Sequence, residues 1–125
     1  MSDSTASTAS AGDSTELARE ITRVASEKLA EEIVALDLRS LVGYADYMIV
    51  MSARNPRQAR AVHDEIRESL KEQGRVPARV EGFEEGDWIL LDYLDCVVHV
   101  FTPEMRERYR LETLWGEAPR LELED

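Results

Sequence analysis

The chain has 125 residues, a hydrophobic content of 43% and a formal net charge of −11. This length suits one domain with a hydrophobic core, and the acidic excess argues for little direct binding to the phosphates of nucleic acid. A basic protein partner is the better expectation. The single cysteine, Cys96, excludes an internal disulfide and a multi-cysteine zinc site, and its apolar neighbours predict a buried thiol in a reducing compartment.

Residues 1–12 are rich in Ser, Thr and Ala, and we expect them to form a disordered tail. They lack both the basic start and the apolar run of a secretory signal. No apolar segment approaches the ~20 residues that are needed to span a bilayer. The sequence therefore predicts a cytoplasmic protein that makes no contact with a membrane.

The first predicted element is an amphipathic helix. Asp13 and Glu16 have the spacing of a capping box, and apolar residues then recur at helical spacing as far as about Ala30. Two strands are predicted after this helix, at residues 33–39 and 47–52. The second strand is nearly all apolar, which favours burial on both faces of a sheet.

Asn55 and Pro56 form a helix start, because the Asn side chain can cap the first turn and the proline ring is preset for it. Gly74 is placed to end this helix. The buried stripe of the helix is predicted to hold Ala59, Val62, Ile66 and Leu70. His63 lies beside the stripe and is expected to be a satisfied structural histidine. A short extended piece then ends at residues 80–81.

Residues 88–101, with the sequence WILLDYLDCVVHVF, have the pattern of a β-hairpin. A two-residue loop at Tyr93 and Leu94 would place Asp92 opposite Asp95. The aliphatic face of this hairpin holds Ile89, Leu91, Cys96, Val98 and Val100, and the mixed face holds Trp88, Leu90, Asp92, Val97, His99 and Phe101. We expect the first face to lie in the core and the second to meet a surface that is both polar and apolar.

Thr102 and Pro103 predict a last helix, which would continue through the segment that ends at Trp115. The acidic residues 119–125 are expected to fray, which leaves a domain over residues 13–118. The predicted order of elements is αββαβββα. This order is typical of a single α/β domain in which helices flank a mixed β-sheet.

Four aspartates lie at the ends of predicted strands, where an enzyme could gather carboxylates for a metal ion or for acid-base catalysis: Asp37, Asp46, Asp92 and Asp95. A nucleotidyltransferase would also need a glycine-serine phosphate loop and a pair of aspartates, and the SARNP segment supplies neither the glycine nor the pair. Alternation places His99 and Cys96 on opposite faces, which excludes a Cys–His dyad. We expect no catalytic residue, metal or cofactor, and a nucleotidyltransferase-like enzyme is the alternative.

Four segments, taken in order, form a highly specific combination: ADYMIVMSARNPRQARAVHDEI, VEG, WILLDYLDCVVHVF and RERYRLETLW. They resemble the ribosomal silencing factor family, also called the Iojap family, over about residues 33–115. The resemblance implies a mixed sheet flanked by helices, related in shape to nucleotidyltransferases but without their catalytic residues. It implies a non-enzymatic protein that binds the large ribosomal subunit through its protein numbered fourteen, blocks joining with the small subunit and represses translation when nutrients are short. It also implies a homodimer, and a role of organellar relatives in assembly of the large subunit.

The resemblance places the partner surface around Trp88 and the following turn, at Asp92, Tyr93, Leu94 and Asp95. The residue pattern alone leaves Trp88 open between a buried indole and an interface anchor. Four further residues match signature positions, where they contact the partner or hold the fold: His99, Arg106, Tyr109 and Glu112. The family usually has glycine where this chain has Leu94, so a different or longer turn is expected. A third possibility is a dimeric adaptor that pairs through its hairpin edge.

Overall fold

The computed structural model describes the backbone of residues 2–41, 43 and 45–123, and the side chains within these ranges from Ser14 onward. The elements are α1 (Ser2–Glu27), β1 (Glu31–Asp37), β2 (Tyr47–Ser52), α2 (Pro56–Lys71), β3 (Arg79–Glu81), β4 (Trp88–Asp92), β5 (Cys96–Phe101), α3 (Pro103–Tyr109) and a 3-10 helix, η1 (Leu111–Trp115). The predicted order of helices and strands is confirmed, and so is the α/β class. Among the described residues, no helix is both long and apolar enough to cross a membrane.

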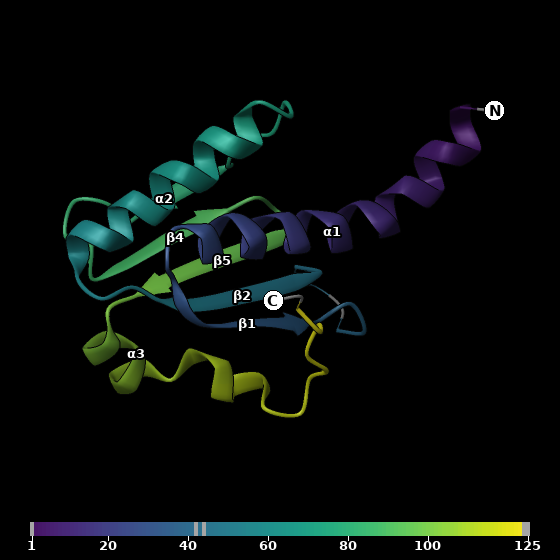
Figure 1. Cartoon of the computed structure of the whole chain (residues 1–125). Helices are drawn as coiled ribbons and strands as arrows, with labels where there is room; N and C mark the ends of the chain where they lie inside the picture. The colour runs from purple at the N-terminus through teal and green to yellow at the C-terminus, as the bar shows by residue number, and fades with distance from the viewer. Residues whose placement is uncertain (1, 42, 44, 124–125) are drawn as a thin grey trace.

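The five strands form one sheet in the order β1-β2-β5-β4-β3. β2 and β5 run parallel, whereas the other neighbouring strands are antiparallel, so the predicted mixed sheet is confirmed. Figure 1 shows α1 and α2 on one side of this sheet, and α3 on the other. We call these two sides the helix side and the α3 side.

The helix side holds the main hydrophobic core. Alternate residues of the three central strands point toward α1 and α2 and are 0% exposed: Ile49, Met51, Ile89, Leu91, Cys96, Val98 and Val100. The predicted stripe of α2 packs against them, and this helix begins as predicted, since the Asn55 side chain accepts a hydrogen bond from the Gln58 N–H at 2.9 Å. The aliphatic face of the hairpin is therefore confirmed as core.

α1 differs from the prediction at both ends. It begins at Ser2, so the backbone is helical where we predicted a disordered tail, and the predicted capping box at Asp13 lies inside the helix. Extending a helix adds one hydrogen bond for each residue that is fixed, which is easier than starting one, and the alanines of this segment favour it. At the other end α1 stops at Glu27, and Leu29, with a φ of 67°, turns the chain toward β1.

β4 and β5 form the predicted hairpin in a register that differs from the predicted one. Asp92 lies opposite Val97 rather than opposite Asp95, so the direct pairing of the two aspartates is wrong. Residues 93–95 separate the two strands, and the Tyr93 N–H donates to the Cys96 carbonyl at 2.9 Å, so the loop is centred on Leu94 and Asp95 rather than on Tyr93 and Leu94. A shift by two positions leaves every side chain on its predicted face, because strand side chains alternate with a period of two.

The C-terminal segment pairs with the edge of the sheet rather than fraying as predicted. The Asp37 N–H donates to the Pro119 carbonyl at 2.7 Å, and the Leu121 N–H donates to the Ala35 carbonyl at 2.8 Å. β1 lies at the edge of the sheet, so the backbone groups on its outer side have no strand partner and can pair with the C-terminal segment. The last helix is also interrupted, because Arg110 adopts a φ of 44° and separates α3 from η1.

Candidate partner-binding surface

Four aromatic rings meet on the α3 side of the sheet. Trp88, at the start of β4, lies opposite Phe101 of β5, and their ring centroids are 4.9 Å apart. Tyr109, at the end of α3, has its ring centroid 4.9 Å from that of Trp88. His99 of β5 stacks on Phe101 at 6.1 Å with an interplanar angle of 13°. Contacts from both the sheet and α3 thus hold the indole ring in place.

A hydrogen bond joins Trp88 to His99. The indole Nε1–H donates to His99 Nδ1 at 3.0 Å. Because an indole nitrogen can only donate, Nδ1 must be unprotonated in this arrangement and the imidazole must be neutral. His99 is 5% exposed, and this burial lowers its pKa to about 4, although the negative charge of Asp92 opposes the shift. His99 is therefore a neutral acceptor at pH 7.

The side chains around Trp88 on the α3 side are incompletely covered. Met48, Leu90 and Val97 lie on this side, because they alternate in step with Trp88 and pair in register across β2, β4 and β5. All three are half-buried, as Trp88 is, and Tyr109 is 48% exposed. We call these five side chains the Trp88 surface. An apolar patch of this kind, bordered by polar groups, is typical of a protein interaction site.

The β4–β5 turn borders this surface next to Val97. Asp92 Oδ1 accepts a hydrogen bond from the Leu94 N–H at 2.8 Å, and Arg79 Nη2 lies 3.9 Å from Asp92 Oδ2. Leu94 has a φ of 74° and a side chain that is 69% exposed. The turn differs from the predicted two-residue loop at Tyr93 and Leu94, but Leu94 still adopts the positive φ that suits glycine, which we had expected a leucine to avoid.

The other two turn residues lie in different surroundings. Asp95 is exposed, and its carbonyl accepts hydrogen bonds from the N–H groups of Asp46 at 2.9 Å and Tyr47 at 3.1 Å, which join the turn to β2. Tyr93 points to the helix side, where it is 6% exposed within the core, and burial raises its pKa to about 12. The structure therefore corrects the placement of Tyr93: it is a core residue and lies outside the Trp88 surface.

Arg106 is buried and braces the fold. It is 8% exposed, and its Nη1 donates to the Glu32 carbonyl at 2.7 Å and to the Ser52 hydroxyl at 2.9 Å. Its Nε donates to Glu112 Oε2 at 3.1 Å. These contacts join α3 and η1 to the ends of β1 and β2. Of the two roles left open for Arg106, these contacts favour holding the fold, because the guanidinium offers a partner little accessible surface.

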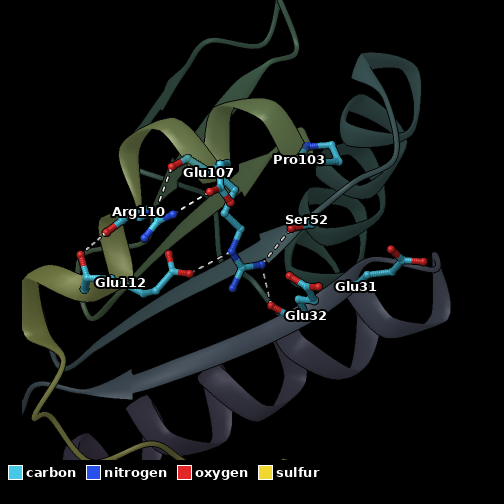
Figure 2. A pocket seen from close by; sticks show the side chains of 9 residues that line it. Glu31, Glu32, Ser52, Pro103, Glu107, Arg110 and Glu112 are labelled. Carbon is cyan, nitrogen blue, oxygen red and sulfur yellow. Dashed lines mark hydrogen bonds and ion pairs between the residues drawn. The ribbon is translucent and has the colours of Figure 1, made fainter.

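A pocket of about 560 Å³ opens beside Arg106. Figure 2 shows residues that line it, among them Glu31, Glu32, Ser52, Pro103, Glu107, Arg110 and Glu112. Arg106 is held by Glu112, and Arg110 Nη2 donates to Glu107 Oε2 at 2.6 Å. Both arginines of the pocket are thus paired with glutamates of the same segment, and only Arg106 also reaches the strand ends, at Glu32 and Ser52.

The loop before β4 sets the position of Trp88. Gly82 has a φ of 80°, and a Cβ atom there would overlap the carbonyl oxygen of Trp88. A side chain at this position would force one of the two backbones to move. The Asp87 carbonyl accepts a hydrogen bond from the Thr102 N–H at 2.9 Å, which ties the same loop to the start of α3. This close approach gives a physical reason for the glycine of the VEG segment.

Two of the strand-end aspartates have partners within the fold. Asp37 Oδ2 pairs with Arg39 Nη2 at 2.8 Å, and the hydrogen bonds from Arg39 lower the pKa of Asp37. Asp92 caps the β4–β5 turn. Within residues 14–41, 43 and 45–123, no three His, Cys, Asp or Glu side chains lie close enough together to hold a metal ion.

His63 is a structural histidine, but only one of its ring nitrogens is satisfied. It is 5% exposed, and its Nδ1 lies 2.9 Å from Asp64 Oδ1. Its Nε2 is buried without a hydrogen-bond partner among the described residues, and its ring lies 4.5 Å from that of Phe83. Burial lowers the pKa of His63, against the raising effect of Asp64. A neutral ring packed against Phe83 follows from these contacts.

A family model described as "Ribosomal silencing factor during starvation" matches residues 11–125. This range contains the whole sheet and the Trp88 surface. The chain belongs to the ribosomal silencing factor family.

Individual members of the family agree with this assignment. A ribosomal silencing factor of Halalkalibacterium halodurans is 40% identical over 98 residues, which cover 78% of this chain and 84% of that protein. A crystal structure of a protein from Bacillus halodurans matches with a TM-score of 0.74 and 34% identity, over 87% of this chain and 96% of that chain. A mouse protein named "Mitochondrial assembly of ribosomal large subunit protein 1" is 32% identical over 89 residues, which cover 69% of this chain and 39% of that protein. Family membership gives the chain a ribosome-associated role in silencing translation.

The structure brings together only part of the site that we predicted for this silencing factor. Trp88, His99 and Tyr109 form one cluster, and Asp92 and Leu94 lie on the bordering turn. Met48, Leu90 and Val97 were not among the predicted partner-binding residues. Alternation already placed the latter two on the correct face, whereas Met48 joins them through the parallel pairing of β2 with β5, which no local pattern encodes.

Proposed function

We propose that this silencing factor acts in the cytoplasm by binding the large ribosomal subunit through its protein numbered fourteen, with the Trp88 surface as the contact. Bound there, it would block joining with the small subunit and repress translation under nutrient limitation. The observation that carries this proposal is the half-buried Trp88 ring, which packs against Phe101 and Tyr109 at one end of an apolar patch. Fixed aromatic anchors of this kind are typical interface hot spots.

The charge of the chain supports a basic partner. The formal net charge is −11, and the exposed Asp95 and the half-buried Asp92 lie on the turn beside the Trp88 surface. Opposite charges on two proteins raise the rate of association, and this attraction weakens as salt is added. The name of the mouse relative refers to assembly of a large ribosomal subunit, which supports the same class of partner. We propose that the protein acts by binding and not by catalysis.

The direct test is cosedimentation of the Trp88→Glu variant with purified large subunits. We expect its affinity to fall by about tenfold or more, because a charge replaces the hot-spot ring. Leu29→Glu is the matched control: it makes the same charge change at an apolar residue that is 66% exposed on the α1–β1 turn, next to α2. This control should bind as the wild type does. Circular dichroism of both variants checks that they are folded.

A second variant makes the test independent of the folding of Trp88→Glu. Tyr109→Ala removes a half-exposed ring that packs against Trp88, and it should weaken binding while α3 keeps its buried Arg106 contacts. Unchanged cosedimentation of both variants would show that the contact lies elsewhere on the protein. The enzyme alternative is tested by calorimetric titration with a nucleoside triphosphate and magnesium. Nucleotide binding that Asp92→Ala abolishes would support that alternative.

A further inference from the structure

We propose that His99 is a positioning residue: its Nδ1 atom holds the Trp88 indole in one orientation and withdraws the indole N–H from a partner. The inference rests on the proposed function of the Trp88 surface, and it adds the chemistry by which that surface meets its partner. His99 itself is buried, so it would act through Trp88 rather than by touching the partner.

The position of the two residues in the hairpin makes this contact possible. Trp88 pairs with Phe101, and His99 pairs with Leu90, so Trp88 and His99 are diagonal neighbours on one face of β4 and β5. Diagonal neighbours are within reach of large side chains. Their ring centroids are 6.0 Å apart, and the Nε1 to Nδ1 distance of 3.0 Å is that of a well-formed hydrogen bond.

Packing against the two neighbouring rings would not by itself determine the orientation of the indole. Phe101 and Tyr109 each lie 4.9 Å from Trp88 between ring centroids, and a ring turned by half a rotation would keep much of the same apolar contact. A hydrogen bond is directional, and only one orientation points Nε1–H at His99. His99 therefore selects which edge of the indole faces away from the sheet.

The selected orientation has a consequence for the partner. Because Nε1–H is bonded within the protein, the accessible part of the half-buried indole consists of carbon atoms. The complementary group on the partner is then an aliphatic side chain or a guanidinium or ammonium group over the ring, rather than a carboxylate or carbonyl at Nε1. A ring that is already fixed also loses less conformational freedom when the partner binds.

The test compares His99→Leu, which cannot accept a hydrogen bond, with His99→Gln, whose side-chain carbonyl can accept one. The readouts are the Trp88 indole N–H signal and its hydrogen-exchange rate in ¹H–¹⁵N spectra, with the Trp115 indole as internal reference, and the affinity for large subunits. We expect His99→Leu to speed exchange of the Trp88 indole about tenfold and to weaken binding about three- to tenfold. His99→Gln should recover part of both.

Each outcome tests a separate part of the proposal. An unchanged indole signal and exchange rate in His99→Leu would overturn the positioning role, whatever the ribosome binding. If the Trp88 indole N–H exchanges faster in His99→Leu but the affinity for large subunits is unchanged, the hydrogen bond has no role in binding the partner. If the Leu variant does not fold, long-range ¹H–¹⁵N spectra of the wild-type imidazole decide, because a protonated Nδ1 overturns the proposal and a bare Nδ1 supports it. Wild-type protein that fails to bind large subunits contradicts the proposed function alone, since the indole and imidazole spectra do not depend on the ribosome.

Discussion

The helix side and the α3 side of the sheet are built from the same strands, but they are covered differently. On the helix side, Leu91 and Val98 belong to an aliphatic layer that is 0% exposed beneath α1 and α2. On the α3 side, the neighbouring residues Trp88 and Leu90 stay half-buried, and His99 brings a polar ring into the layer. Figure 1 shows the reason: two long helices lie on one side and a short helix and a connecting segment lie on the other.

With the Trp88 surface as the proposed contact, this contrast would let one sheet separate stability from recognition. Removal of apolar surface from water stabilises a fold by about 25 cal/mol for each Å², so the fully covered side contributes more to stability. The incompletely covered side keeps apolar surface that a partner can bury. Because adjacent strand residues point to opposite sides, the two functions are assigned to alternate positions of the same strand.

Leu91 and Leu90 are the sharpest pair with which to test this contrast. Leu91→Ala should lower the free energy of unfolding by about 3 to 4 kcal/mol, because it leaves a cavity in a fully buried layer. Leu90→Ala should lower it by about 1 kcal/mol, because that side chain is already partly in water. Urea denaturation measures both changes.

Binding should reverse the order of the two leucines. Leu90→Ala should weaken binding to large subunits by about three- to tenfold, whereas folded Leu91→Ala should bind as the wild type does. Equal loss of stability in the two variants, or equal loss of binding, would break the division between the two sides.

A change at Gly82 should disturb both sides together, because its backbone touches the start of β4. Gly82→Ala should lower the free energy of unfolding by about 2 to 3 kcal/mol, since the new Cβ would overlap the Trp88 carbonyl and φ is 80°. Gly74→Ala is the matched control, with a φ of 81° and nothing within 4 Å of the new Cβ. The control should lose only about 1 kcal/mol in the same denaturation experiment. Similar losses in both would argue against the close approach.

The pH dependence of stability should report the buried imidazole of the α3 side. The pKa of His99 is about 4 in the folded protein against 6.5 for the ordinary side chain, so the unfolded chain binds the proton first as pH falls. Stability should therefore drop between pH 6.5 and pH 4. From pH 7 to pH 5 we expect a loss of about 2 kcal/mol for this residue.

His99→Gln isolates this effect, because every other titrating group, including His63, is shared with the wild type. As the pH falls from 7 to 5, the wild type should lose about 2 kcal/mol more of its unfolding free energy than His99→Gln loses. A difference that does not change with pH would show that His99 titrates at its ordinary value in the folded protein.

Leu94 should give the smallest effect, and one that favours the variant. Leu94→Gly should raise the free energy of unfolding by about 0.5 to 1 kcal/mol, because glycine adopts a φ of 74° without the steric penalty of a Cβ atom. Leu94→Ala is the control, since it removes the exposed side chain but keeps the Cβ. Thermal unfolding of the two variants separates these contributions, and a gain in both would point to the side chain instead.

Much of the fold could be predicted from neighbouring residues. The Asn55 cap, the α2 stripe and the two faces of the hairpin depend on contacts within a few positions or on simple alternation. The shared face of Trp88 and His99 was predicted by the same alternation, whereas their role toward a partner stays a proposal. The end of α1 and the interruption at Arg110 were missed, since these depend on how the chain turns to meet the sheet.

The sequence by itself determined the class of the fold, the side of the sheet to which each strand residue points and the family to which the chain belongs. The tertiary structure alone decided that Tyr93 lies in the core, that Met48 joins the Trp88 surface and that Arg106 is tied to Glu32 and Ser52. The physical reason is the range of the interactions. Alternation and capping act between neighbours, whereas register, parallel pairing and buried polar contacts join residues that are far apart in the chain, so they depend on the packing of the whole domain.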